Sequence, residues 1–520
     1  MAEAESQRET IAFLSRPEAY GLKGDAVERV ETHGAIVFLA GAFAYKLKRA
    51  VRYTYMDYST AEKRRAMCLR ELEINRPLAP PIYLEVRTIL RDTRGNLRFG
   101  PADASDALDA VVVMRRFDQE TLFGRLCDAG KLTPELVRQT ADTVADFHAH
   151  AEITKAFGGA DGFEAAMREN NSVLASMIGA PFAADDVADY ARKNEAAFRQ
   201  IAQFLERRRE GGLVRRCHGD LHLNNIFLHD GKPMLFDALE FEDNFACIDV
   251  LYDLAFLLMD LEHHGARAHA NTLLNRYLEI TQDYDGMEAM PAFLACRAAI
   301  RAHVNVSRAK ATGHEQSKQS DGAKAYFQEA RRYLRAVPPR LVVVGGLSGT
   351  GKTTIARLIA PAIGRAPGAV ILRSDITRKH LMGVSETTRL PESAYSPAMN
   401  VKVFSEMAKT AATILAAGHA VVMDAVYGTK AERDEIAAVA GKAGARFDGF
   451  WLEADSEVLA QRIAGRSGDA SDATVAVLKK QLAAIPAPGD WITIDASGTP
   501  DAIAKDVMNR LSAIPSKDTG

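Results

Sequence analysis

The sequence predicts two domains, an α+β domain followed by an α/β domain with a doubly wound parallel sheet. Its 520 residues exceed what one hydrophobic core usually organises. In the N-terminal part short strand patterns precede long helical ones, whereas strands and helices alternate in the C-terminal part. Between the two patterns stand Pro338 and Pro339, which cannot continue a helix. We therefore predict domains over residues 1–336 and 337–520.

The composition is that of a soluble globular enzyme, with 47% hydrophobic and 26% charged residues. A formal net charge of −3, with both signs mixed along the chain, does not favour a general nucleic-acid binder. The five cysteines are widely spaced and form no C-x-x-C pair, so neither a disulfide framework nor a zinc site is indicated. A reducing compartment suits such cysteines.

The chain start is polar and acidic, where a signal peptide would need a basic start and an apolar core. The most apolar helical segment runs from Val250 to Leu261. It contains Asp253 and Asp260, and it is shorter than the roughly 20 apolar residues that span a bilayer. We therefore expect a cytoplasmic protein without a membrane partner, with its oligomeric state left open.

The N-terminal domain begins with strand-like stretches around one helical segment at 60–77, and helical sequence follows from about residue 131. The strand-like stretches lie at 35–39, 43–47, 82–90 and 109–115. This order predicts a small sheet lobe ahead of a larger helical lobe. Short strand-like pieces at 214–237 then interrupt the helices.

The segment from His218 to Asn225 has the spacing H-x-D-x-x-x-x-N of kinase catalytic loops. In such a loop the aspartate, here Asp220, accepts the proton of the acceptor hydroxyl, and the asparagine binds Mg²⁺. Asp237 follows on the next apolar strand, where a second metal carboxylate is needed. The alternative is an ordinary loop with capping Asp and Asn residues.

These residues resemble the aminoglycoside-phosphotransferase and choline-kinase family, which has a protein-kinase-like fold. The resemblance covers about residues 20–330 and extends to Asp249-Val-Leu-Tyr-Asp253, which looks like the helix that braces the catalytic loop in this family. The family uses ATP and Mg²⁺, so the resemblance implies both here.

By the same resemblance, Lys46 should pair with the phosphates of ATP and Glu71 should hold that lysine. Lys48 lies on the same strand face as Lys46, and Glu73 competes with Glu71, so both pairs remain open. Exposed lysines and glutamates are also common without any role.

The sequence departs from protein kinases in two respects. No G-x-G-x-x-G precedes the lysine, since only Gly34 and Gly41 are present there. The triplet at the metal position reads Asp237-Ala-Leu rather than Asp-Phe-Gly, which favours a small-molecule acceptor over a protein. We interpret His222 and Cys217, which flank the catalytic loop, as packing or polar scaffolding.

The C-terminal domain alternates apolar runs with helical periodicity, which predicts βαβ units. The apolar runs lie at 341–345, 369–373, 420–424, 447–452 and 491–494, and the helical segments lie at 399–417, 430–443, 455–465 and 472–484.

Directly after the first apolar run, the chain matches G-x-x-x-x-G-K-[ST] and then enters a helical segment. Glycines let the backbone wrap close to phosphates, Lys352 reaches the β- and γ-phosphates, and the Thr353 hydroxyl takes Mg²⁺. A glycine-rich turn with an incidental lysine is the alternative. The predicted nucleotide-binding residues are Gly346, Ser348, Gly349, Thr350, Gly351, Lys352, Thr353 and Thr354.

Two aspartates follow strand ends, where open α/β sheets bind their substrates. We assign Asp424 to the metal and Asp375 to the acceptor hydroxyl, although either could simply cap a helix. Arg462 and Arg466 lie four residues apart on a predicted helix before a small-residue loop, as in a closing lid that aims arginines at the transferred phosphate. A solvated basic helix face is the alternative.

The motifs of residues 341–511 resemble the P-loop kinase group of zeta-toxin-like, gluconate-kinase-like and chloramphenicol-phosphotransferase-like proteins. They read GGLSGTGKTT, RSDITRKHL, VVMDAVYGTKAERDE and RIAGRSGDASDA. The resemblance implies phosphorylation of a small-molecule hydroxyl, with Asp375 as base or acceptor-orienting group. It places Arg378 and Arg433 on the substrate side.

The whole sequence therefore predicts a fused phosphotransferase whose two domains use ATP and Mg²⁺ and act on small hydroxyl-bearing acceptors. One alternative is a nucleotide-sensing regulatory protein in which one domain binds ATP without turnover. Another is a polynucleotide 5′-hydroxyl kinase activity of the P-loop domain, which the near-neutral charge does not favour.

Overall fold

The chain forms two compact units in a computed structural model that describes residues 7–23, 26–32, 34–53, 56–179, 181–312, 316–465 and 471–513, excepting the side chains of 308–320. The first unit consists of the chain up to His264 together with Ala292–Ala330. The second consists of Gly265–Pro291 together with the chain from Arg331 onward. The predicted boundary at 336/337 divides the chain at a single point. The second unit, however, also contains Gly265–Pro291, which precede that point.

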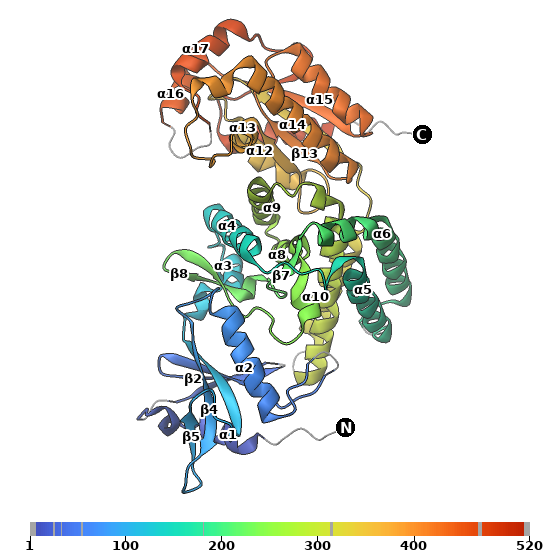
Figure 1. Ribbon diagram of the computed structural model, residues 1–520. Helices are drawn as coiled ribbons and strands as arrows, with labels where there is room; N and C mark the ends of the chain where they lie inside the picture. The colour runs from blue at the N-terminus through green and yellow to red at the C-terminus, as the bar shows by residue number, and fades with distance from the viewer. Residues whose placement is uncertain are drawn as a thin grey trace. The chain divides into compact units, whose positions relative to one another are not determined.

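The sheet of the first unit has six antiparallel strands in the order β1-β2-β3-β6-β4-β5 (Figure 1). The strands are β1 (Glu28–Glu31), β2 (Ala35–Ala40), β3 (Phe43–Lys48), β4 (Tyr83–Arg91), β5 (Leu97–Gly100) and β6 (Asp109–Arg115). Helix α2 (Ala61–Asn75) contacts β4 and β6. Residues alternating along β6 enter two separate hydrophobic clusters, one with Val111 and one with Val112, so the sheet is packed on both faces.

The remainder of the first unit is mainly helical. Its helices are α1 (Arg8–Leu14), α3 (Phe123–Asp128), α4 (Pro134–His150), α5 (Gly159–Ser176), α6 (Ala184–Glu210), α7 (Asp243–Ala246), α8 (Val250–His263), α10 (Met290–Thr312) and α11 (Gln316–Tyr333). Two small antiparallel pairs join β7 (Val214–Arg216) to β10 (Cys247–Asp249) and β8 (Ile226–His229) to β9 (Lys232–Leu235). Almost every residue of α8 is buried, which accounts for its apolar sequence. No described helix is long and apolar enough to cross a membrane.

The second unit contains a five-stranded parallel sheet in the order β12-β13-β11-β14-β15. Its strands are β11 (Arg340–Gly346), β12 (Val370–Arg373), β13 (Val421–Asp424), β14 (Arg446–Glu453) and β15 (Ile492–Asp495). Val342 and Val344 pack against α12 and α18 in one hydrophobic cluster, and the intervening Val343 is equally buried on the other face. Helices therefore cover both faces, as in doubly wound sheets.

Seven α-helices of the described residues after Arg331 accompany this sheet. They are α12 (Lys352–Ile359), α13 (Ser374–Leu381), α14 (Pro397–Ala416), α15 (Lys430–Lys442), α16 (Ser456–Ala464), α17 (Val475–Ala484) and α18 (Pro500–Ala513). Helix α9 (Arg267–Thr281) and the turn η4 (Asp285–Glu288) also pack here, beside β12 and α14.

The predicted fold class is confirmed in both units. Strands β1 and β5 were not predicted, because β1 is exposed throughout and β5 is at most half-buried, so neither carries an apolar pattern. Helix α13 was not predicted either, since it begins at the residue that follows β12 with no intervening turn.

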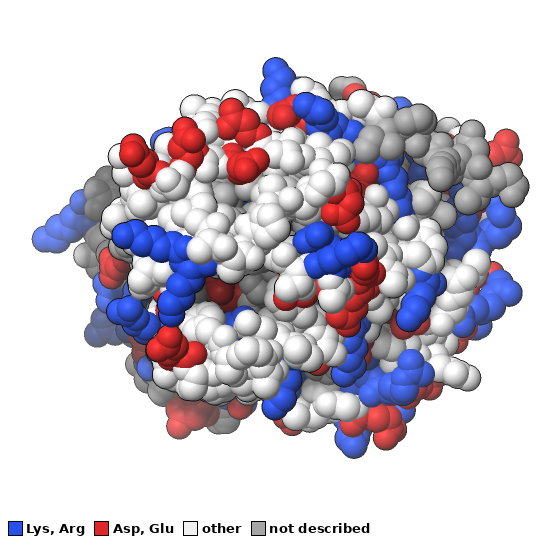
Figure 2. Space-filling model, turned by 90° about the horizontal axis from the view of Figure 1, so that it is seen from above, with Lys and Arg blue, Asp and Glu red and all other residues white. Residues whose placement is uncertain are grey.

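Charges of both signs are interspersed on the face of the molecule seen in Figure 2, where no continuous basic stripe is visible. This distribution agrees with the near-neutral composition.

Candidate active sites

The catalytic loop of the first unit leaves β7 and ends in the turn η3 (Leu223–Asn225) before β8. Gly219 has φ +80°, and a Cβ there would lie 2.9 Å from Cδ1 of Leu239 and 3.0 Å from the Phe245 carbonyl oxygen. A side chain at this position would be both strained and crowded. The glycine of the motif is therefore required by the loop itself.

Helix α8 holds this loop in place. The Asp253 carboxylate accepts the backbone N–H of His218 at 3.1 Å and that of Gly219 at 2.9 Å. About two turns further along, Asp260 accepts the N–H of Leu223 at 2.9 Å. The two acidic residues that interrupt the apolar pattern of α8 thus satisfy buried backbone donors.

Asp220 lies at the centre of the loop with its side chain 36% exposed. Asn225 Nδ2 donates to Asp220 Oδ2 at 3.2 Å, and His222 Nε2 lies 3.4 Å from the same oxygen. Desolvation opposes ionisation of Asp220, but the charges of His222 and Arg301 hold its pKa below the usual range. Asp220 is therefore ionised at neutral pH, and its side chain faces partly into solvent.

The lysines of β3 meet three acidic residues that come from distant parts of the chain. Lys46 Nζ lies 2.8 Å from Glu71 Oε1 and 2.5 Å from Asp237 Oδ1. Lys48 pairs with the other oxygen of Glu71 at 2.6 Å and also with Glu240. Glu71 is fully buried and bridges both lysines, whereas the competing Glu73 is exposed.

Asp237 has φ +62°, a left-handed conformation that is uncommon outside glycine. Asn75 of α2 stabilises the backbone there, since its Oδ1 accepts the N–H of Ala238 at 2.7 Å and its Nδ2 donates to the Ala238 carbonyl at 3.1 Å. The Tyr83 hydroxyl accepts the N–H of Asp237 at 3.2 Å. Our sequence analysis missed Asn75 and Tyr83, because nothing in their local pattern indicates a contact more than 150 residues away.

The oxygen ligands of this region fit Mg²⁺, which prefers carboxylate and amide oxygens. The Asp237 side chain is 41% exposed. The hydrogen bonds from Asn225 to Asp220 use its Nδ2 and leave its amide oxygen as the remaining ligand atom.

In the second unit the P-loop connects β11 to α12. Gly349 has φ +90°, and a Cβ there would lie 2.7 Å from the Leu459 carbonyl oxygen. The Thr350 hydroxyl donates to the Leu347 carbonyl at 2.8 Å, and Lys352 Nζ donates to the same oxygen at 2.9 Å. The Ser348 N–H is held by Gln481 of α17 at 2.9 Å. Gly346 and Gly351 also have positive φ, and Thr354 is exposed.

Thr353 and Asp424 meet at the carboxyl end of β13. The Thr353 hydroxyl donates to Asp424 Oδ2 at 2.5 Å, and Arg373 Nε lies 3.5 Å from the same oxygen. A hydroxyl beside a carboxylate at the start of a P-loop helix is a donor set that fits Mg²⁺.

Asp375 lies in the first turn of α13. Burial, followed by the negative charge of Asp424, raises the pKa of Asp375 above its usual range. A raised carboxyl pKa brings the group closer to the range in which general bases work at neutral pH.

The four arginines named from the sequence have different surroundings. Arg462 donates to the Ala496 carbonyl at 2.9 Å, beyond the end of β15, and its role in a lid stays a prediction. Arg466 lies outside the described residues. Arg378 donates to the Ala394 carbonyl at 2.8 Å, and Arg433 contacts the carbonyl oxygens of Tyr427 and Gly428 at 3.3 and 3.4 Å.

Comparison with known proteins gives matches to both units. A family model described as a phosphotransferase enzyme family matches residues 52–290, and one described as an AAA domain matches residues 341–488. Uncharacterized protein Rv2004c of Mycobacterium tuberculosis (strain H37Rv) is 32% identical over 484 residues, which are 90% of this chain and 92% of that protein. Uncharacterized protein Mb2027c of Mycobacterium bovis matches to the same extent, with 32% identity over 484 residues.

Two solved structures each cover one part of the chain. A choline/ethanolamine kinase family protein from Mesorhizobium loti is 13% identical and covers 63% of this chain and 95% of its own, with a TM-score of 0.41. A gluconokinase from Sinorhizobium meliloti 1021 is 21% identical and covers 34% of this chain and 94% of its own, with a TM-score of 0.25.

Proposed function

Since the chain belongs to the family of these mycobacterial relatives and joins a phosphotransferase-family unit to a P-loop kinase-like unit, we propose that both units transfer the γ-phosphoryl group of ATP to a small-molecule hydroxyl. Kinase-type domains support a phosphotransferase, and our proposal adds ATP, Mg²⁺, the alcohol acceptor and activity in both units.

In the first unit, Asp220 accepts the proton of the acceptor hydroxyl as the hydroxyl oxygen attacks the γ-phosphorus, the bond from the γ-phosphorus to the β,γ-bridging oxygen breaks, and ADP leaves. Lys46, held by Glu71, binds the ATP phosphates. The turn between β2 and β3 spans two residues, Gly41 and Ala42, so the lysine rather than a long glycine loop must carry this contact. Asn225 and Asp237 would hold Mg²⁺, which neutralises phosphate charge.

In the second unit, the backbone of Gly346 to Gly351 and Lys352 bind the phosphates of ATP, and Thr353 with Asp424 would hold Mg²⁺. Asp375 accepts or orients the acceptor hydroxyl. Charge that develops on the transferred group is then stabilised by the fixed donors of the P-loop.

One observation carries the proposal. In each unit, a residue of the nucleotide-binding motif directly contacts a carboxylate that was assigned independently to the metal. These contacts are Lys46 to Asp237 at 2.5 Å and Thr353 to Asp424 at 2.5 Å. In the proposed mechanism both residues of each pair act on the phosphates of one nucleotide, which requires them to be neighbours.

A metabolite screen with the full-length protein tests the proposal. The protein is incubated with ATP, Mg²⁺ and a cell extract, and mass spectrometry follows metabolites that gain one phosphoryl group. We expect products whose formation requires both ATP and Mg²⁺. Tight ATP binding without any phosphorylated product would contradict the proposal and favour a nucleotide-sensing role.

A further inference from the structure

Helix α9 precedes α10 in the chain, yet it packs on the P-loop unit along β12, the first strand of the sheet order. Two asparagine side chains of α9 bond to the open backbone edge of β12. Asn271 and Asn275 donate to the Ala369 carbonyl at 3.0 and 3.2 Å, and Asn275 Oδ1 accepts the Ile371 N–H at 2.6 Å. Such an edge is otherwise open to unwanted strand pairing.

These contacts recur at matching intervals along α9 and the strand. The residues of α9 that face β12 are four apart, and the partners on the strand are two apart. Four helical residues rise roughly 6 Å, and two strand residues advance roughly 6.6 Å, so successive side chains stay in step. One turn beyond Asn275, the same face of α9 carries Glu279 opposite Arg373.

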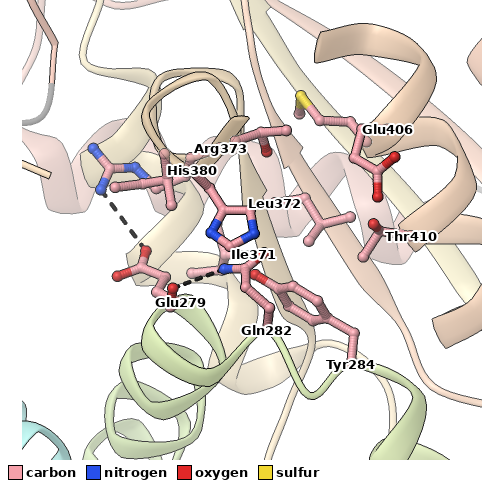
Figure 3. A pocket seen from close by; sticks show the side chains of 12 residues that line it. Glu279, Gln282, Tyr284, Ile371, Leu372, Arg373, His380, Glu406 and Thr410 are labelled. Carbon is pink, nitrogen blue, oxygen red and sulfur yellow. Dashed lines mark hydrogen bonds and ion pairs between the residues drawn. The ribbon is translucent and has the colours of Figure 1, made fainter. Parts of the chain in front are cut away.

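Glu279 makes an ion pair with Arg373, which Figure 3 shows as a dashed line. Arg373 Nη1 lies 3.8 Å from Glu279 Oε1, while Arg373 Nε lies 3.5 Å from Asp424 Oδ2. The Thr353 hydroxyl donates to that same Asp424 oxygen at 2.5 Å. The side chains of Arg373 and Glu279 are only 4% and 7% exposed, so the charges act on one another with little screening.

A cavity lies beside this ion pair, between α9, β12, α13 and α14 (Figure 3). Its volume is about 20 Å³, room for one water molecule. Ligand pockets usually enclose about 300 Å³ or more, so an acceptor does not bind here. Arg276 of α9 also lies 3.6 Å from Glu279 Oε2, and of these two arginines it is Arg373 that connects Glu279 to Asp424.

We propose that Glu279 is a positioning residue of the P-loop site, where it balances the charge of Arg373 and thereby keeps Asp424 available to the metal. The inference rests on the proposed function of the second unit. Arg373 and Mg²⁺ are both cations, and both would bind the Asp424 carboxylate. Without the negative charge of Glu279, the guanidinium would close on Asp424 and compete with the metal.

The test measures the affinity of the full-length protein for N-methylanthraniloyl-ATP, with excess Mg²⁺ and with EDTA. Energy transfer from the two tryptophans reports on the second unit, because Trp451 and Trp491 are the only tryptophans of the chain and both lie there. An Asp237→Asn background weakens nucleotide binding by the first unit. Asn271→Ala is the control, since it removes one hydrogen bond between α9 and the Ala369 carbonyl, which Asn275 also contacts, and leaves Arg373 and its charged partners in place.

We expect Glu279→Gln to weaken nucleotide binding about tenfold in Mg²⁺ and to leave it unchanged in EDTA, which is the size of effect that partners of metal ligands have. Glu279→Asp, which keeps the charge, is expected to lie between this variant and the wild type, and Asn271→Ala to behave like the wild type. Equal Mg²⁺ dependence in Glu279→Gln and wild type would overturn the inference. An equal loss in Asn271→Ala would also overturn it and would show that α9 docking alone matters.

Failure of the proposed function is distinguishable from these results. If the wild-type second unit binds no nucleotide under either condition, the P-loop assignment and the inference fall together. If the wild type binds nucleotide with a clear Mg²⁺ dependence that Glu279→Gln shares, only the inference falls.

Discussion

In the proposed mechanism single carboxylates carry the chemistry of both units, and their neighbours determine how each one behaves. Asp220 has a lowered pKa beside His222 and Arg301, although desolvation acts against this, so it is ionised well below neutral pH. Asp237 is held in a left-handed conformation by Asn75 and Tyr83. The chemistry of Asp220 and the metal contact of Asp237 should therefore be separable by mutation.

We expect Asp220→Asn to reduce phosphoryl transfer by the first unit by about 10²–10⁴-fold with little loss of nucleotide affinity, because a general base contributes roughly that factor. Asp237→Asn should reduce both transfer and affinity, and asparagine tolerates the left-handed conformation of this position. Calorimetric titration with ATP and Mg²⁺, beside turnover of the same full-length variants, is the measurement. Turnover by the first unit that survives Asp220→Asn would refute the assigned base.

His419 makes the stability of the second unit depend on pH. Burial, followed by the charge of Arg365, lowers the pKa of His419 to about 3, and its Nε2 lies 2.9 Å from the Met287 carbonyl. Because the pKa of His419 is lower in the folded state than in the unfolded state, neutral His419 contributes stability above about pH 6.5. This contribution is lost as the pH falls toward 3.

Lowering the pH from 7.5 to 5.5 should therefore reduce the unfolding free energy of the second unit by about 1.4 kcal/mol through His419. His419→Gln should remove that part of the pH dependence, as measured by denaturant unfolding followed through tryptophan fluorescence. His303→Gln is the control, because His303 is a partly buried histidine, with its pKa lowered to about 4 by desolvation, but lies in the first unit, which has no tryptophan. A pH dependence that His419→Gln leaves intact would contradict the assignment.

At the scale of elements, each site is assembled by helices that are distant in sequence from its motifs. Helix α8 fixes the catalytic loop through Asp253 and Asp260, and α2 fixes the backbone after β9 through Asn75. The sequence patterns predicted most of these helices and strands, because apolar periodicity follows burial. They could not predict which side chains meet across the fold, since such contacts depend on tertiary packing.

We expect Asn75→Ala to lower the unfolding free energy of the first unit by about 1–3 kcal/mol, because it leaves the buried N–H and carbonyl of Ala238 without their partner. The change should also weaken Mg²⁺-dependent nucleotide binding by this unit. Calorimetric unfolding of the full-length protein measures the first effect, in the transition that is silent in tryptophan fluorescence. Asn244→Ala, on the surface, should shift that transition by less than about 0.5 kcal/mol, and an equal shift in both variants would count against the role of Asn75.

At the scale of the whole molecule, the chain order and the compact units differ in one segment. The proline pair lies near residue 338, after the point at Arg331 where the chain re-enters the second unit, and α9 also belongs to that unit. Its sequence is that of an ordinary amphipathic helix, and periodicity says that a helix buries one face without saying against which core. Only the contacts of α9 with β12 therefore show that this helix belongs to the second unit.

We expect a fragment of residues 338–520 to unfold at a lower temperature than the tryptophan-monitored transition of the full-length protein, because it lacks the side chains that bond to the β12 edge. A synthetic peptide of residues 265–291 should raise the unfolding temperature of this fragment further at each higher peptide concentration, as any ligand of the folded state does. A peptide with Asn271→Ala and Asn275→Ala should do so less. A fragment as stable as the intact unit, with no response to the peptide, would show that α9 is dispensable.

The central claim is that one chain contains two independent phosphotransferase centres, and the product spectrum of selective variants tests it most directly. Full-length wild type, Asp220→Asn, Lys352→Ala and the double variant are each incubated with ATP, Mg²⁺ and the same metabolite extract, and phosphorylated products are compared by mass spectrometry. We predict that each single variant loses a different set of products and that the double variant forms neither set. A single variant that abolishes every product, or a double variant that retains them, would contradict the claim.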